Sequence, residues 1–142
     1  MYFEPTIGLT FNEPVANLTA GTFSIFDIIV VGEAVSITDL LYQKSDGKWW
    51  RADADAAATM PGLRMALQAV GANAACNTLR MGRVRNDTWA WTVGGTIFAS
   101  TTTGALTQTA PSGTADIVQV VGFAYAATKM FFDPSNDTIE IL

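Results

Sequence analysis

Residues Asp116–Ala127 read D-I-V-Q-V-V-G-F-A-Y-A-A and carry a single charge at their start. Branched and aromatic residues dominate this stretch, as is typical of an extended strand. Because successive side chains of a strand point to opposite faces, one face would carry Ile117, Gln119, Val121, Phe123 and Tyr125, and the other Val118, Val120, Gly122, Ala124 and Ala126. Both faces are mostly apolar, so we expect this longest extended stretch to be covered on both sides, with a bend at Gly122.

Further short runs of alternating or β-branched residues recur along the chain, separated by Gly and Asn-Asp turns. They predict strands at 23–31, 35–42, 49–51, 63–70, 77–85, 88–93, 96–100 and 138–142, while 105–109 is short and polar. Within 88–93, the residues Trp89, Trp91 and Val93 are predicted to share one face. Residues 52–59 are rich in alanine but precede Pro61-Gly62, so at most two helical turns or a loop are expected there. About ten short strands joined by tight turns predict an all-β fold, a small β-sandwich or barrel.

The composition indicates one domain whose surface is poor in charge. Of the 142 residues, 49% are hydrophobic and only 15% are charged, whereas an average soluble domain has about 25% charged residues. No run reaches the roughly 20 apolar residues of a membrane span, and the first residues lack the pattern of a secretion signal. We therefore expect no membrane association, and we expect another protein chain to cover part of the surface.

Charge and residue types argue against several classes of function. The net charge of −5 and the isoelectric point of about 4.4 disfavour nucleic acid as a partner, since such binding needs a basic stripe. The cationic cluster Arg80, Arg83 and Arg85 is flanked by Asp87 and predicts a solvated or salt-bridged edge. The absence of histidine excludes Ser-His-Asp and Cys-His catalysis and His-ligated metals. The single cysteine, Cys76, lies among small residues and is expected to be buried or half-buried.

Acidic residues offer two candidate sites, and neither pattern is complete. Asp53 and Asp55 form a D-x-D pair, but alanines stand where a calcium loop would need further oxygen ligands. Paired carboxylates for glycoside hydrolysis would be this pair, or Glu33 with Asp39, and neither has a recognisable context. We therefore predict no metal, no cofactor and no enzymatic activity.

Two neighbouring tryptophans, Trp49 and Trp50, are candidate contact residues. Because neighbours on a strand point to opposite faces, one of them is expected in the core of the subunit. The other is either buried in a subunit interface or exposed, where its ring would offer a stacking platform for sugar.

Residues 1–22 differ from the rest because proline and glycine are mixed with large apolar side chains. Tyr2, Phe3 and Phe11 are candidate partner contacts in this segment. An extended arm that packs on a neighbouring subunit fits this mixture, and an ordinary edge strand of the same subunit fits it about equally. We predict an N-terminal arm or attachment segment over 1–22 and a β domain over 23–142, in which Phe123 and Tyr125 are further candidate contacts.

Four pieces of the chain between Leu41 and Ile141 match one group of proteins in order and spacing. They are Leu41–Trp50 with Ala52–Asp55, Trp91–Ser100, Thr101–Thr114, and Val118–Ala124 with Phe131–Pro134. In these pieces the chain resembles tailed-bacteriophage virion proteins of the head-fibre, head-decoration or tail-fibre type.

The resemblance implies a β domain on the virion surface, often trimeric and without enzymatic activity. We therefore expect a structural protein of the virion that decorates or cements the capsid as an oligomer, most simply a homotrimer. Its partners would be copies of itself and the major capsid protein or another virion protein. The alternative function is a tail-fibre or receptor-binding module that recognises glycans of the host surface.

Overall fold

The computed structural model describes residues 18–20 and 24–142, and their fold is all-β as predicted. The strands are β1 (Leu18–Ala20), β2 (Ile25–Val30), β3 (Leu40–Gln43), β4 (Trp49–Arg51), β5 (Arg64–Ala66), β6 (Ala75–Asn86), β7 (Thr96–Ala99), β8 (Leu106–Thr107), β9 (Ile117–Val118), β10 (Val120–Ala126), β11 (Lys129–Phe132) and β12 (Ile139–Glu140). One 3-10 turn, η1 (Ala57–Thr59), lies in the alanine-rich stretch, where a short helix or a loop was expected.

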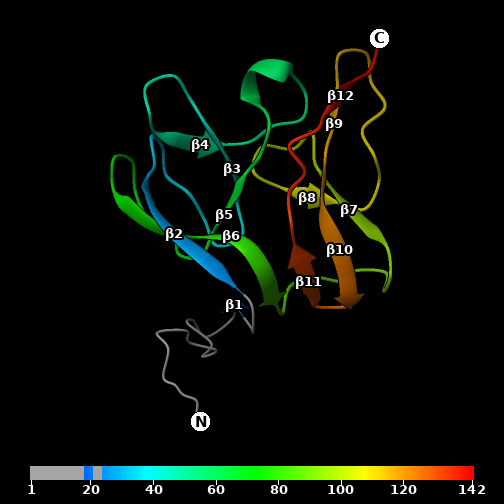
Figure 1. Ribbon diagram of the computed structural model, residues 1–142, viewed down its shortest axis with the longest axis horizontal. Helices are drawn as coiled ribbons and strands as arrows, with labels where there is room; N and C mark the ends of the chain where they lie inside the picture. The colour runs from blue at the N-terminus through cyan, green and yellow to red at the C-terminus, as the bar shows by residue number, and fades with distance from the viewer. Residues whose placement is uncertain (1–17, 21–23) are drawn as a thin grey trace.

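Ten of these strands form one curled sheet, which Figure 1 shows wrapping part of the way around the core. Its main path has the order β4-β3-β5-β6-β11-β10-β7-β8, and β1 and β2 pair with β6 outside this path. The pairs that these ten strands form with one another are antiparallel. The remaining strands, β9 and β12, form a two-stranded ribbon near the C-terminus (Figure 1).

The strand β6 joins the two halves of the sheet, and with 12 residues it is the longest strand of the described chain. Its first half pairs with β5 and β2, and its second half pairs with β11 and β1. The two halves meet at Gly82, whose φ of +146° is a conformation that residues with a Cβ rarely adopt. A Cβ at this position would also lie 2.6 Å from the Cα of Ser24. Glycine therefore permits both the bend of β6 and the close approach of the neighbouring chain.

Two hydrophobic cores lie on opposite faces of β3 and β5. Neighbouring residues of these strands alternate between the cores: Leu40 and Met65 belong to the main core, and Leu41 and Ala66 belong to the second. The main core also contains fully buried side chains from the far half of the sheet, Ile97, Val121, Met130 and Phe132. The second core includes Ile29, Val31, Val35, Trp49 and Cys76. The burial of Cys76 was predicted, and burial also raises the pKa of its thiol.

Two predicted strands are shorter than expected because side chains terminate them. The predicted strand 35–42 begins only at Leu40, since Asp39 accepts a hydrogen bond from the backbone N–H of Ser36 at 2.9 Å and closes a turn there. The predicted strand 63–70 ends at Ala66, because the side chain of Gln68 accepts from the N–H of Asn77 at 2.7 Å and bends the chain away.

The prediction of a strand at 88–93 was wrong. The backbone of Thr92 is held by the side-chain amide of Gln108, which accepts from its N–H and donates to its C=O, each at 2.8 Å. Other backbone groups of this segment are also bonded outside a strand ladder. A turn forms at Asn86, and the Trp91 N–H donates a hydrogen bond to the Ala127 carbonyl oxygen at 2.8 Å. Trp89 and Trp91 still pack together against the main core, with ring centroids 5.3 Å apart, but Val93 faces solvent.

The predicted continuous strand over 116–127 is divided into β9 and β10, and its two faces were predicted wrongly. Val120 pairs with Phe98 but Gly122 pairs with Ile97, so Val121 is an extra residue that shifts the alternation. As a result Val121 and Ala124 are buried, whereas Val120, Phe123 and Tyr125 lie on the exposed face. The expectation that both faces are covered therefore does not hold within the described residues of one chain.

Candidate functional site

The exposed face of β7, β10 and β11 carries a cluster of large apolar side chains, which we call the outer patch. Its members are Val120, Phe123 and Tyr125, which are exposed, and Phe98 and Phe131, which are half-buried. Phe131 stands opposite Phe123 and Phe98 opposite Val120 in the strand register, and cross-strand partners share a face. The bulge at Val121 therefore places all five side chains on one side of the sheet.

Aromatic rings give the outer patch a preformed surface. The rings of Phe123 and Phe131 are 6.1 Å apart and tilted by 42°, a spacing at which aromatic pairs attract each other. The guanidinium carbon of Arg83, on the neighbouring β6, lies 5.4 Å from the centre of the Tyr125 ring. Phe123 is 47% and Tyr125 37% exposed, so both retain area that a partner can bury. The structure thus brings these two sequence-predicted contact residues together.

The other predicted contact residues lie elsewhere. Trp49 is buried in the second core, with the guanidinium of Arg64 4.9 Å from its ring centre. Trp50 is half-buried on the opposite face, and its indole N–H lies 3.3 Å from a carboxylate oxygen of Asp46. The ammonium of Lys44 sits 3.9 Å over the Trp50 ring and occupies one stacking face. Tyr2, Phe3 and Phe11 lie outside the described residues.

A second apolar surface on β2 was not singled out from the sequence. Ile25, Phe26, Ile28 and Val30 are all exposed, although the run reads like a buried strand. The alternation of Phe26, Ile28 and Val30 at every second position is the feature that identifies this row. The sequence alone does not reveal which face of this run lacks a cover.

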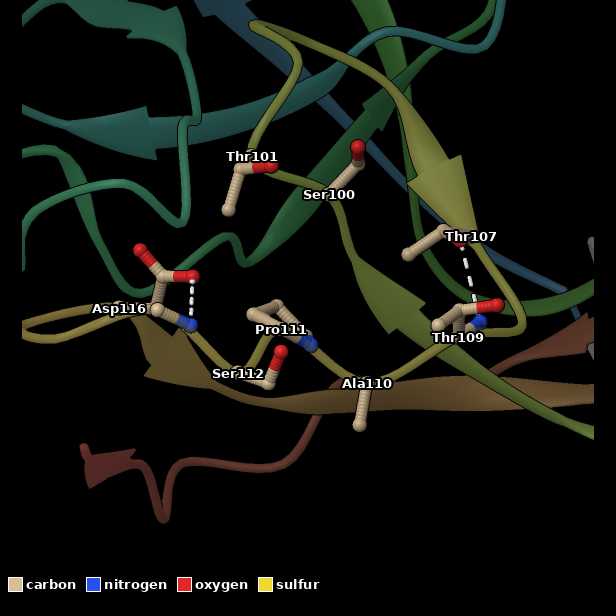
Figure 2. A pocket seen from close by; sticks show the side chains of 9 residues that line it. Ser100, Thr101, Thr107, Thr109, Ala110, Pro111, Ser112 and Asp116 are labelled. Carbon is tan, nitrogen blue, oxygen red and sulfur yellow. Dashed lines mark hydrogen bonds between the residues drawn. The ribbon is translucent and has the colours of Figure 1, made fainter.

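A small hollow of about 290 Å³ lies between Ser100-Thr101 and the segment from Thr107 to Asp116, and several hydroxyl groups line it (Figure 2). Its lining includes Ser100, Thr101, Thr107, Thr109 and Ser112, with Asp116 at one end. The Thr107 hydroxyl oxygen accepts from the N–H of Thr109 at 3.1 Å, and a carboxylate oxygen of Asp116 accepts from the N–H of Gly113 at 2.7 Å. These acceptors serve the loop backbone, while the hydroxyl hydrogens remain able to donate to a polar ligand.

The predicted carboxylate pairs serve local structure. Asp53 accepts from the N–H of Asp55 at 3.0 Å and from the hydroxyl of Thr103 at 2.7 Å. Glu33 forms an ion pair with Arg51 at 3.3 Å, whereas burial raises the pKa of Asp39 against the opposing effects of the Ser36 N–H and of Arg51. Within residues 18–20 and 24–142, no group of three or more acidic, cysteine or histidine side chains is placed to hold a metal.

No protein-family model and no curated protein matches the chain. Among the described residues, no helix has the length and apolar character needed to cross a membrane.

Proposed function

We propose that the protein is a non-enzymatic structural component of a bacteriophage virion, which decorates or cements the capsid as a homo-oligomer, most simply a trimer. The observation that carries the proposal is the outer patch. Four aromatic side chains and a valine lie together on one face of the sheet, and two of the aromatics are exposed. Contiguous apolar surfaces of this kind mark protein interfaces, and the sequence resemblance supplies the virion context.

The proposed mechanism is burial of the outer patch between copies of the chain or against the capsid. Removing the remaining exposed area of one aromatic side chain from water stabilises an interface by about 1–2 kcal/mol. The contribution is repeated in every subunit of a symmetric oligomer. A protein that binds the assembled shell but not a loosened one raises the stability of the shell by mass action.

Oligomer mass tests this proposal directly. Sedimentation velocity at micromolar concentration should give an oligomer for the wild type and smaller species for Phe123→Ser. Ile139→Ser is the matched control, because Ile139 is also apolar and exposed (66%) but lies on β12, outside the patch. A monomeric wild type would contradict the oligomer, and equal effects of the two substitutions would contradict burial of the outer patch in its interface.

Antibody labelling of intact particles in the electron microscope tests the location. Label spread over the head supports decoration of the capsid. Label confined to the tail tip would overturn it in favour of receptor binding.

The hydroxyl-lined hollow favours a second candidate function, recognition of a host glycan by a tail-fibre or receptor-binding module. Hydroxyl donors with one carboxylate acceptor suit a polyhydroxylated ligand. Trp50 contributes less to this candidate, because Lys44 already covers one face of its ring. Binding to an array of bacterial surface polysaccharides, lost in Asp116→Ala but kept in Asp53→Ala, would support glycan recognition.

A further inference from the structure

A groove of about 530 Å³ crosses the sheet beside the second core. Five neighbouring strands contribute to it, through Trp49 (β4), Gln43 (β3), Arg64 (β5), Met81 (β6) and Ile25 (β2). Gln43 stands opposite Trp49 and Ile25 opposite Met81 in the strand register, so the groove runs across the strands. Four spacings of about 4.8 Å between neighbouring strands give a path of about 19 Å, which holds about six residues of an extended chain.

The lining of the groove is apolar over much of its length. Leu63 lies between the two ends, and Pro134, from the segment after β11, adds to the lining. Ile25 is 44% exposed and Met81 is half-buried, so both side chains retain area that a ligand can cover. A concave apolar surface with a few polar groups is the usual form of a binding site.

Arg80 is a cation of this groove without a partner. It belongs to the cluster that was predicted to form a solvated or salt-bridged edge, in which Arg85 pairs with Asp87 at 3.1 Å and Arg83 lies 5.4 Å from the ring centre of Tyr125. In residues 18–20 and 24–142, the exposed Arg80 side chain makes no ion pair. Its guanidinium therefore offers an uncompensated charge and five N–H donors to a ligand.

Arg64 adds a second guanidinium, which is held in place. Its Nε and Nη2 atoms donate to one carboxylate oxygen of Asp27 at 3.2 and 3.1 Å, and its Nη1 atom donates to the Leu63 carbonyl oxygen at 2.9 Å. The side chain is only 16% exposed and lies over the Trp49 ring. These three hydrogen bonds leave two of its five N–H groups for a ligand. Because Asp27 balances the charge of Arg64, the attraction for an anionic group depends on Arg80.

The other polar groups of the groove suit a peptide backbone. The side-chain amide of Gln43 donates to the Gly47 carbonyl oxygen and keeps its own oxygen as an acceptor, and Asn136 offers a second amide. The carboxylate of Asp133 forms no ion pair within the part of the chain that the structure describes. Acceptors and donors together match the alternating N–H and C=O groups of an extended chain, which leaves Arg80 for an acidic side chain.

We infer that this groove binds an extended peptide segment of another virion protein, in which an acidic side chain pairs with Arg80 and adjacent apolar side chains cover Ile25 and Met81. The inference rests on the proposed function, which supplies the virion partner. It gives the two surfaces different roles, since the outer patch joins copies of the chain and the groove holds the partner. Because salt screens an exposed ion pair, the binding should weaken as the ionic strength rises.

Selection from a displayed library of random peptides tests the inference on the full chain. We expect the wild type to enrich peptides in which Asp or Glu stands beside apolar residues, and Arg80→Glu to enrich Lys or Arg at that position. The matched control is Lys129→Glu, which makes the same change of charge on β11 outside the groove and should keep the acidic preference. A wild type without acidic preference, or the same preference in Arg80→Glu, would overturn the inference.

The affinity of one selected peptide, measured by fluorescence anisotropy, tests the two kinds of contact separately. Its dissociation constant should rise at least about tenfold in Arg80→Ala, because a hydrogen bond to a charged group is lost. Ile25→Ser should also weaken binding, whereas Ile28→Ser should not, since Ile28 lies on the same strand but outside the groove. Equal effects of the two serine substitutions would place the peptide elsewhere and overturn the inference.

Oligomer mass and particle labelling separate this inference from the proposed function. Arg80→Glu should sediment like the wild type, and smaller species would mean that a second copy occupies the groove, against the inference. If the wild type is an oligomer that depends on Phe123 and labels the capsid but enriches no acidic peptide, the groove inference is wrong and the proposed function stands. If acidic peptides are enriched while particles carry no label, the virion partner fails with the proposed function and the peptide site remains.

Discussion

Replacing Gln119 by leucine should remove much of the stability of the domain. Gln119 is fully buried, accepts from the N–H of Gly62 at 2.9 Å, and donates to the carbonyls of Gly62 and Ser135, each at 2.8 Å. Leucine has a similar volume but leaves these three backbone groups without a partner. A buried unpaired group costs about 1–3 kcal/mol, and the added apolar burial returns about 1–2 kcal/mol. We expect a net loss of roughly 4 kcal/mol, against a total stability of about 5–15 kcal/mol.

Urea unfolding followed by tryptophan fluorescence measures this loss, and the chain contains its own control. Gln108 holds Thr92 by the same pair of hydrogen bonds, but this pair is exposed, so water can replace the amide in Gln108→Leu. We expect less than about 1 kcal/mol there, with an unchanged m-value in both variants. For Gln119→Leu the thermal midpoint should fall by about 12–20 °C.

Similar losses in the two leucine variants would refute the reasoning, because only burial distinguishes the two sites. Gln119→Glu adds a test of direction. Burial and the two facing carbonyls should raise the pKa of the new carboxyl group. A folded-state pKa above the unfolded value means that stability is highest at low pH and falls as the pH rises through the folded pKa. Relative to the wild type, this variant should therefore be more stable at about pH 4 than at about pH 7.

The remaining predictions concern two positions. Gly122→Ala should destabilise the domain by at least about 2 kcal/mol in urea unfolding, because φ is +156° and the new Cβ would collide with the carbonyl oxygen of Phe131; a loss below about 0.5 kcal/mol would contradict the assigned bulge. Burial raises the pKa of Asp39, so wild-type stability should fall relative to Asp39→Asn as the pH rises from below 3.8 towards neutrality. A constant difference between the urea midpoints of the wild type and of Asp39→Asn over that pH range would contradict this prediction.

Local pattern was sufficient to predict the all-β class and several strands, because period-two alternation depends on neighbouring residues alone. The run 77–85 is part of β6, and 96–100 contains β7; buried and more exposed residues alternate in both, apart from the buried neighbours Thr78 and Leu79. The failure at 88–93 has a distant cause. The Gln108 side chain, 16 residues away, holds the backbone of Thr92 in place of a neighbouring strand. Such a contact leaves no trace in the periodicity of the segment itself.

The outer patch was predictable in part. Phe123 and Tyr125 stand out as large apolar residues in a long strand, but their exposure depends on the bulge at Val121, which reverses the faces after it. The bulge in turn depends on how Gly122 packs beneath Phe131, a tertiary contact. The β2 row was missed for the opposite reason. Its residues look like a core strand, and only the tertiary structure reveals that the side chains of one face are exposed.

The arrangement of β1 and β2 along β6 has a mechanical consequence. Both strands run antiparallel to β6 on the same side, with three paired positions in β1 and six in β2. Their hydrogen bonds lie perpendicular to the strands, so tension applied at Leu18 along the strand axis stretches these bonds in shear, together rather than one at a time. If the segment before Leu18 ties the protein to a neighbour, a swelling shell would pull in this direction. The sheet would then resist as a whole until many bonds fail at once, instead of peeling open from one end.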